Sequence, residues 1–129
     1  MSPKHLGIAA LVAVLCGIGG WVWGASGRAD REAARKVAEQ RADLTEARLL
    51  IREGQVEVYR LNFGDASQRF TAALAVIERV QRQWRETGQA ERAGRLEIAL
   101  AHVRDAARLA TGLDAAAHQS AEAALPLLQ

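Results

Sequence analysis

"LNFGDASQRFTAAL", residues 61–74, contains the clearest break in a chain rich in helix-forming residues. Gly64 can adopt the left-handed conformation that closes a helix, and Asp65 can cap the next helix by accepting a backbone N–H. We expect Phe63 to pack under this turn. Apolar side chains then recur at helical spacing at Ala66, Phe70, Ala73 and Leu74. The stretch therefore predicts two helices joined by a short turn.

Outward from this turn, three segments repeat apolar residues at a period of 3.5. In the first segment, large residues recur every seven positions at Val37, Leu44, Ile51 and Val58. Three positions after each of these stands a second series of mostly small residues: Gln40, Ala47, Gly54 and Leu61. The second segment has Ala66, Phe70, Ala73, Ile77, Val80 and Trp84. The third has Ala93, Leu96, Leu100, Val103, Ala107 and Ala110. This pattern is typical of helices packed in a left-handed bundle.

A fourth segment, 114–125, has fewer large apolar residues, so we expect it to be the least stable helix. Its candidates for burial are Leu113, Ala117, Ala121, Ala124 and Leu125, and Pro126 ends it. "TGQ" at 87–89 and "TGLD" at 111–114 offer further Gly stops and polar starts. Turns this short place neighbouring helices antiparallel.

The predicted fold class is all-α. A single N-terminal transmembrane helix, in residues 1–27, precedes a bundle domain that covers residues 28–129. The bundle contains three long helices and one short C-terminal helix, at about 28–61, 65–87, 89–111 and 114–125.

Composition limits the classes of function. The 129 residues fit one domain, and positive and negative charges alternate along residues 31–48 despite a net charge of +2, which does not favour nucleic-acid binding. The single cysteine, Cys16, excludes a disulfide framework within the chain. We expect no cofactor and no bound metal.

Residues 6–25 lack any charged side chain, and 20 residues of helix span about 30 Å, the thickness of a bilayer's hydrocarbon core. Trp21 and Trp23 would suit the membrane interface. A cleaved signal peptide is the alternative, since small residues at 25–27 follow the apolar run. Small residues spaced four apart could pack against another membrane helix, or reflect the usual composition of spans: Ala9, Ala13, Gly17, Gly20 and Gly24.

The charges that flank this segment predict its orientation. Lys4 precedes it, whereas Arg28, Arg31, Arg35 and Lys36 follow it, and basic residues near a span tend to stay in the cytoplasm. We therefore expect a single-pass protein of a bacterial inner membrane with its C-terminal domain in the cytoplasm. A periplasmic domain remains the alternative.

Residues 50–74 resemble one tetratricopeptide repeat, the two-helix unit of many adaptor proteins. The family's packing roles would fall to Gly54, Phe63, Ala66, Phe70 and Ala73. A fainter echo begins at residue 112 and lies 51 residues further on, whereas the family repeats every 34. Glu57 also stands where the family has an aromatic residue. The resemblance implies a divergent hairpin that serves protein–protein contact.

Catalytic motifs are missing from the sequence: it has no HExxH, glycine-rich phosphate loop or cysteine pair. If the last two helices pack antiparallel with their turn near Gly112, His102 and His118 lie at different levels of the hairpin and do not meet. We therefore expect both to be solvated or at a rim. We predict that the protein is not an enzyme. Large apolar side chains off the seams, or at their edges, are candidate partner contacts: Leu49, Tyr59, Val76 and Trp84.

These features favour a membrane-anchored adaptor or accessory scaffold subunit, which braces a larger membrane complex through helix–helix contacts. Its expected partners are the lipid bilayer and other membrane protein subunits, with no nucleic acid. One alternative is a periplasm-facing envelope chaperone or secretion factor. Another is a coiled-coil membrane protein that forms a homo-oligomer through the seam from Val37 to Leu61.

Overall fold

The structure is a computed structural model that describes the backbone of residues 3–129 and the side chains of residues 27–129. Four helices follow one another: α1 (Pro3–Tyr59), α2 (Phe63–Glu86), α3 (Ala90–Thr111) and α4 (Ala117–Ala124), with a 3₁₀ turn η1 (Leu125–Leu128) at the end. The described chain has no strands, which confirms the predicted all-α class with three long helices and a short C-terminal one.

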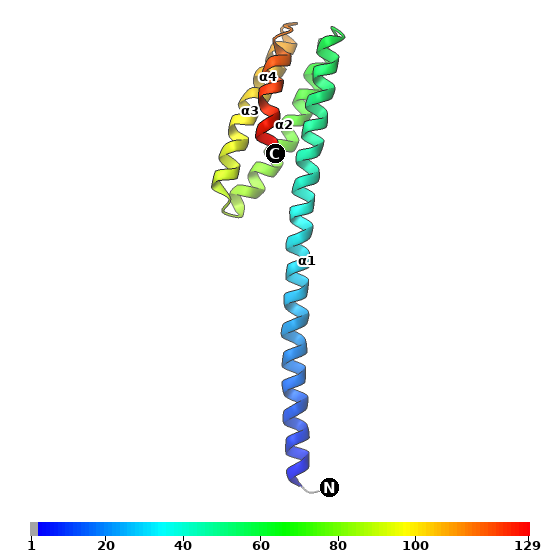
Figure 1. The fold of residues 1–129 in the computed structure, drawn as a ribbon, viewed down its shortest axis with the longest axis vertical. Coiled ribbons are helices and arrows are strands. Elements are labelled where there is room, and N and C mark those ends of the chain that lie inside the picture. Colours follow the sequence, from blue (N-terminus) through cyan, green and yellow to red (C-terminus); the bar gives the residue numbers. More distant parts are fainter. Residues whose placement is uncertain (1–2) are drawn as a thin grey trace. The chain divides into compact units, whose positions relative to one another are not determined.

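The chain divides into two compact units, Met1–Ala38 and Glu39–Gln129. In the second unit successive helices reverse direction, so the end of α1 and the helices α2, α3 and α4 form an antiparallel bundle (Figure 1). The described residues of the first unit all belong to α1. Residues 28–39 of α1 are all exposed, and Lys36 pairs there with Glu32 at 3.6 Å, one helical turn away.

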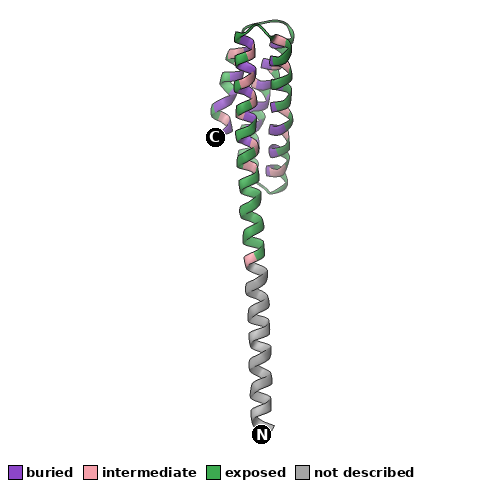
Figure 2. Cartoon of the chain, turned by 90° about the vertical axis from the view of Figure 1, so that its right-hand side faces the viewer, coloured by how far each residue is buried: buried purple, intermediate pink, exposed green. Residues whose placement is uncertain are grey.

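The bundle core follows the period-3.5 seams, and Figure 2 shows the buried residues on the inward faces of the helices. On α2 every residue of the predicted seam is buried: Ala66, Phe70, Ala73, Ile77, Val80 and Trp84. On α1 the buried apolar residues are Leu44, Ala47, Ile51 and Val58. The middle of the predicted seam from Val37 to Leu61 therefore packs inside its own chain.

Three predicted core residues are exposed instead: Val37 by 47%, Leu61 by 73% and Leu113 by 70%. Val37 precedes the unit that contains the bundle. Leu61 and Leu113 lie in turns, where the backbone has left the helix and directs their side chains away from the core. The sequence also missed Leu128, which η1 brings into the core at 0% exposure. The α-helix α4 itself ends at Ala124, shortly before Pro126 as predicted, and the buried chain continues through η1.

The turns close by one shared pattern, which corrects the predicted role of Gly64. In each turn a residue with positive φ precedes an N–H that bonds to the carbonyl five residues back: Asn62 to Glu57, Gln89 to Trp84, and Asp114 to Leu109, at 2.8–2.9 Å. The left-handed residues are Leu61 (φ 59°), Gly88 (φ 75°) and Leu113 (φ 60°). Gly64 instead lies inside the first turn of α2, with open space around it.

Asp65 was predicted to cap α2, but the residue at the N-cap position is Asn62, and its side chain does not bond to the helix backbone. The Asn62 amide donates to the carboxylates of Glu57 and Asp65 at 3.1 and 2.7 Å. Asp65 therefore helps to fix the turn from inside the helix. Asp114 provides a polar start before α4, because its Oδ1 accepts the backbone N–H of Ala116 at 2.8 Å.

Among residues 27–129, no helical segment is both long and apolar enough to cross a membrane. The predicted span lies outside the residues with described side chains. The same applies to the residues assigned to its packing and to its interfaces: Ala9, Ala13, Gly17, Gly20, Gly24, Trp21 and Trp23.

Candidate functional site

The α1–α2 hairpin is built around a close approach of Gly54 to Phe70. A Cβ added at Gly54 would lie 2.6 Å from Cε1 of the Phe70 ring, so no larger residue fits without displacement. Phe70, Ala66 and Ala73 have 0% exposure, and Phe63 is partly buried against the same core. This arrangement is compatible with the helical hairpin that the tetratricopeptide resemblance implied.

The four residues expected to contact a partner separate into two pairs. Leu49 and Tyr59 on α1 are 58% and 71% exposed. Val76 and Trp84 on α2 are only 6% and 8% exposed, so these two lie in the core and not on an open surface. The reason is that α2 is covered from two sides: by α3, and by α1, where the Trp84 indole N–H donates to Oε1 of Gln40 at 2.9 Å.

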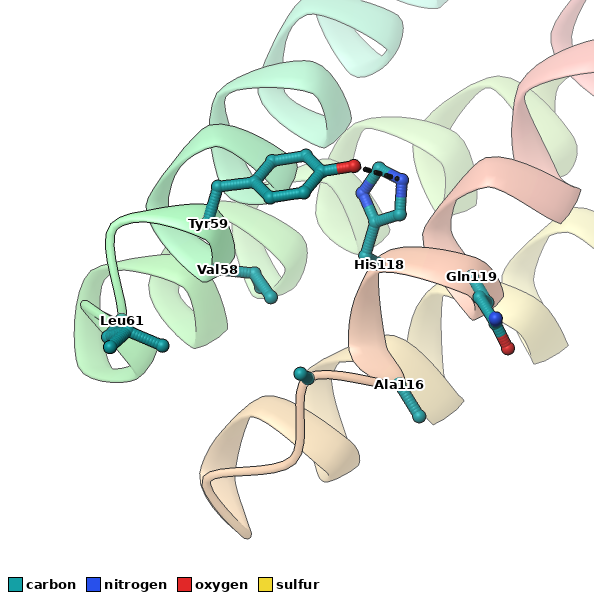
Figure 3. Close-up of a pocket in the computed structure, with 7 residues that line it drawn as sticks. Val58, Tyr59, Leu61, Ala116, His118 and Gln119 are labelled. Carbon is teal, nitrogen blue, oxygen red and sulfur yellow. Dashed lines mark hydrogen bonds between the residues drawn. The ribbon is translucent and has the colours of Figure 1, made fainter.

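A groove lies between the end of α1 and the start of α4, with a volume of about 460 Å³ (Figure 3). Tyr59 and His118 point toward one another across it, and the exposed Leu61 forms part of its edge. The other lining residues are mostly small or apolar: Val58, Ala115, Ala116 and Gln119. The groove can therefore accept an apolar group and offers polar atoms at one wall.

The Tyr59–His118 pair is the feature that sequence reasoning missed. The Tyr59 hydroxyl lies 3.0 Å from Nε2 of His118, and the two ring centroids are 4.6 Å apart. The other ring nitrogen, Nδ1, is buried and has no hydrogen-bond partner. The sequence argument placed His118 only relative to α3, the helix that precedes α4 in the chain. In the structure His118 instead meets Tyr59 of α1, which lies 59 residues earlier.

A polar network beside the groove holds α4 against α1. Gln55 is 3% exposed, and its Nε2 donates to the His118 carbonyl oxygen at 3.3 Å and to Oε2 of Glu122 at 2.9 Å. Arg52 donates from Nη1 to the same carboxylate oxygen at 3.0 Å and to Oε1 of Gln55 at 3.2 Å. Because its amide groups are bonded, buried Gln55 fixes the register of the two helices.

On its other side α4 is tied to α3. The Ser120 hydroxyl donates to Oδ2 of Asp105 at 2.8 Å. Hydrogen bonds from Arg108 and then Ser120 lower the pKa of the Asp105 carboxyl below its ordinary value. Both walls of the groove are therefore positioned by contacts inside the bundle.

The polar network around Glu122 should make the folded protein less stable in acid. The hydrogen bond from Gln55 lowers the pKa of Glu122 most, and the charges of Arg52 and His118 add to this. A carboxylate with a lowered folded-state pKa stabilises the fold above its unfolded-state pKa, near 4.5, and this contribution disappears as pH falls through the folded value. We expect the melting temperature of Glu122→Gln to fall less than that of the parent below about pH 5.

The measurement is thermal unfolding of the full chain in mild detergent, followed by circular dichroism between pH 7 and pH 3. Gln55→Met is the matched variant, because it removes the amide donor while it retains the carboxylate. Its dependence on acid should also become weaker. An unchanged slope in both variants would show that the network does not contribute to the acid sensitivity.

Within the part of the chain with described side chains, no group of three or more His, Cys, Asp or Glu residues is arranged to hold a metal ion. A second shallow groove, of about 450 Å³, lies on the outer side of α1, where Leu49 and Val56 are exposed. Charged residues surround these two: Arg52, Glu53, Glu57, Arg60 and Arg69.

No protein-family model matches the chain, and comparisons with curated proteins and with solved structures likewise find no match. Function must therefore be inferred from the bundle and its surfaces.

Proposed function

We propose that this protein is a membrane-anchored, non-enzymatic adaptor or accessory subunit, which braces a larger membrane protein complex through helix–helix contacts. The anchor in this proposal is the uncharged segment 6–25. The observation that supports a binding role is the preformed groove between α1 and α4, with large apolar side chains exposed at its edge.

The left-handed leucines give physical support to this role. Leu61 and Leu113 have φ values of 59° and 60°, a conformation that costs roughly 1–2 kcal/mol for a residue with a Cβ. Both are at least 70% exposed, so burial in the bundle does not offset the strain. Strained backbone and exposed apolar side chains together are typical of binding surfaces.

The groove fits an apolar helix or helix end from a partner subunit. Apolar partner side chains would cover the exposed Leu61, Ala115 and Ala116. The Tyr59 hydroxyl and the His118 imidazole can exchange hydrogen bonds with a polar group at the edge of such a helix. Because the polar network already holds α4 in place, little ordering entropy would oppose binding.

Affinity purification of the full chain from membranes in mild detergent tests the proposal. The parent should co-purify with one or more membrane protein subunits in constant ratio. Tyr59→Asp, which places a charge at the groove, should reduce their recovery about tenfold or more, equivalent to at least 1.4 kcal/mol. Ile98→Asp is the matched control, because Ile98 is exposed by 53% on α3, away from the groove.

Two outcomes would contradict the proposal: recovery of the chain in the aqueous fraction, or equal co-purification by the parent and Tyr59→Asp. A reporter fused after Gln129 decides between the two compartments. Activity in the cytoplasm supports the bracing role as stated, whereas periplasmic activity favours the envelope chaperone, for which the same groove would hold an apolar segment of a client.

A further inference from the structure

The outer face of α1 carries a second series, of small and apolar residues with one threonine, on the side opposite to the buried one. Its members are all exposed and belong to the unit that contains the bundle: Ala42, Thr45, Leu49 and Val56. At 100° per residue this series is centred about 160° from the buried series of Leu44, Ala47, Ile51 and Val58. The helix therefore presents one seam to its own bundle and another to its surroundings.

Charges of opposite sign flank the outer seam in two separate rows. Arg41 and Arg48 lie seven residues apart on one side of it, and Glu46 and Glu53 lie seven residues apart on the other. If Ala42 and Leu49 are assigned to position a of a heptad and Thr45 to position d, the arginines occupy g and the glutamates occupy e. One flank is therefore basic and the other acidic.

We propose that the outer face of α1 docks on the same face of a second copy of this chain, with the two helices parallel and in register. In a parallel pair each g residue meets the e residue of the following heptad on the other helix. Arg41 would meet Glu46 of the second copy, and Arg48 would meet Glu53 of the second copy. Two-fold symmetry repeats both contacts.

The same charge rows disfavour the antiparallel arrangement. There g residues face g residues and e residues face e residues, so Arg41 and Arg48 would meet arginines, and Glu46 and Glu53 would meet glutamates. The sign pattern therefore selects one orientation of one occupant. Copies inserted in a membrane in the same direction would present their α1 helices in this parallel orientation.

Contacts within the chain are compatible with this pairing. Glu53 pairs with Arg69 at 3.1 Å and Glu46 lies 3.9 Å from Arg79, but both glutamate side chains remain 42% and 56% exposed. Each carboxylate has acceptor sites for a second partner. Arg52, which would occupy position d, is instead drawn toward α4 by its 3.0 Å contact with Glu122. The Arg52 guanidinium therefore has an anionic partner within each copy, although its side chain stays 59% exposed.

The outer seam has few large apolar side chains, so the pairing should be weak between free molecules. A shared membrane would confine the copies and raise their effective concentration. The surface and its charge pattern do not depend on the proposed anchor; only the strength of pairing does.

Crosslinking of the full chain in membranes tests the contact. In a Cys16→Ser background, Leu49→Cys places a thiol on the symmetry axis, and a short bis-maleimide should convert it to a species of twice the mass. Ile98→Cys, in the same background, is the control on an exposed site of α3 and should stay monomeric. Thr45→Cys should crosslink as Leu49→Cys does.

Charge exchange tests the orientation. Arg41→Glu alone and Glu46→Arg alone each create two like-charge contacts across the symmetric pair, and each should lower the yield of Leu49→Cys crosslinking about tenfold. The double variant Arg41→Glu/Glu46→Arg restores opposite charges between copies and should recover the yield. A merely structural effect of either substitution would not be rescued by the other.

Failure of this inference differs from failure of the proposed function. If Leu49→Cys gives no crosslinked dimer, the second copy is not the occupant of this face. The same conclusion follows if the losses of crosslinking yield in the two single charge variants add up in the double variant. A Leu49→Cys adduct with a different protein would also overturn it, and would place a heteromeric subunit on this face. Co-purification through Tyr59 is measured separately and is unaffected by these results.

Discussion

Phe70→Ala is expected to lower the free energy of unfolding by about 3–5 kcal/mol. Phe70 is the largest of the fully buried residues among those with described side chains, and its ring packs against α1 at Gly54. Truncation removes apolar contact and leaves a cavity that the neighbouring helices fill only in part. The α1–α2 hairpin should therefore lose its main point of contact.

Thermal unfolding of the full chain in mild detergent, followed by circular dichroism at 222 nm, measures this loss. For a bundle of this size each kcal/mol corresponds to roughly 4–8 °C in melting temperature. Ile98→Ala is the matched control, because its side chain is exposed, and it should change stability by about 0.5 kcal/mol or less. A Phe70→Ala protein that melts within a few degrees of the parent would contradict the hairpin packing described above.

Gly54→Ala should destabilise the bundle even though alanine is the better helix former. The new methyl carbon would lie 2.6, 2.9 and 3.0 Å from three carbons of the Phe70 ring, and this ring is fully buried in the core. Overpacking of this kind costs typically 1–3 kcal/mol, which exceeds the gain of up to about 1 kcal/mol in helix propensity. The net effect should be a lower melting temperature.

Gly94→Ala provides a control of opposite sign. Gly94 also lies inside a helix, but nothing stands within 4 Å of the position its Cβ would occupy. There the same substitution should stabilise by about 0.5–1 kcal/mol. If the two alanine variants behave alike, the close approach of Gly54 to Phe70 is wrong.

A double variant isolates the contact. Gly54→Ala combined with Phe70→Leu replaces the ring by a smaller side chain that leaves room for the methyl group. Since the two residues touch, their effects should not add, and the double variant should be more stable than the sum of the single changes predicts. Additive losses would mean that each substitution acts on a separate part of the core.

Much of the bundle was predictable because its determinants are local and repetitive. The spacing of Ala66, Phe70 and Ala73 requires one buried face whatever that face packs against. The positions of the three turns were also readable from glycine and polar residues. The geometry of the turns was not readable, because sequence alone does not show that the left-handed residues are Leu61, three residues before Gly64, and Leu113, directly after Gly112.

The candidate groove could not be predicted because it depends on the alignment of helices that are distant in the chain. Tyr59 and His118 belong to α1 and α4, and no periodicity within either helix relates them. Val76 shows the opposite error. It is not a member of the predicted seam, which suggested a surface residue, but coverage of α2 from two sides places it in the core.

The left-handed leucines have a consequence for directed evolution. Glycine or asparagine would occupy positions 61 and 113 with less backbone strain, so a library screened only for heat resistance should become enriched in such replacements. A library screened in cells for assembly should retain the leucines. Different residues at positions 61 and 113 after the two selections would show that the leucines lower thermal stability but favour assembly with a partner.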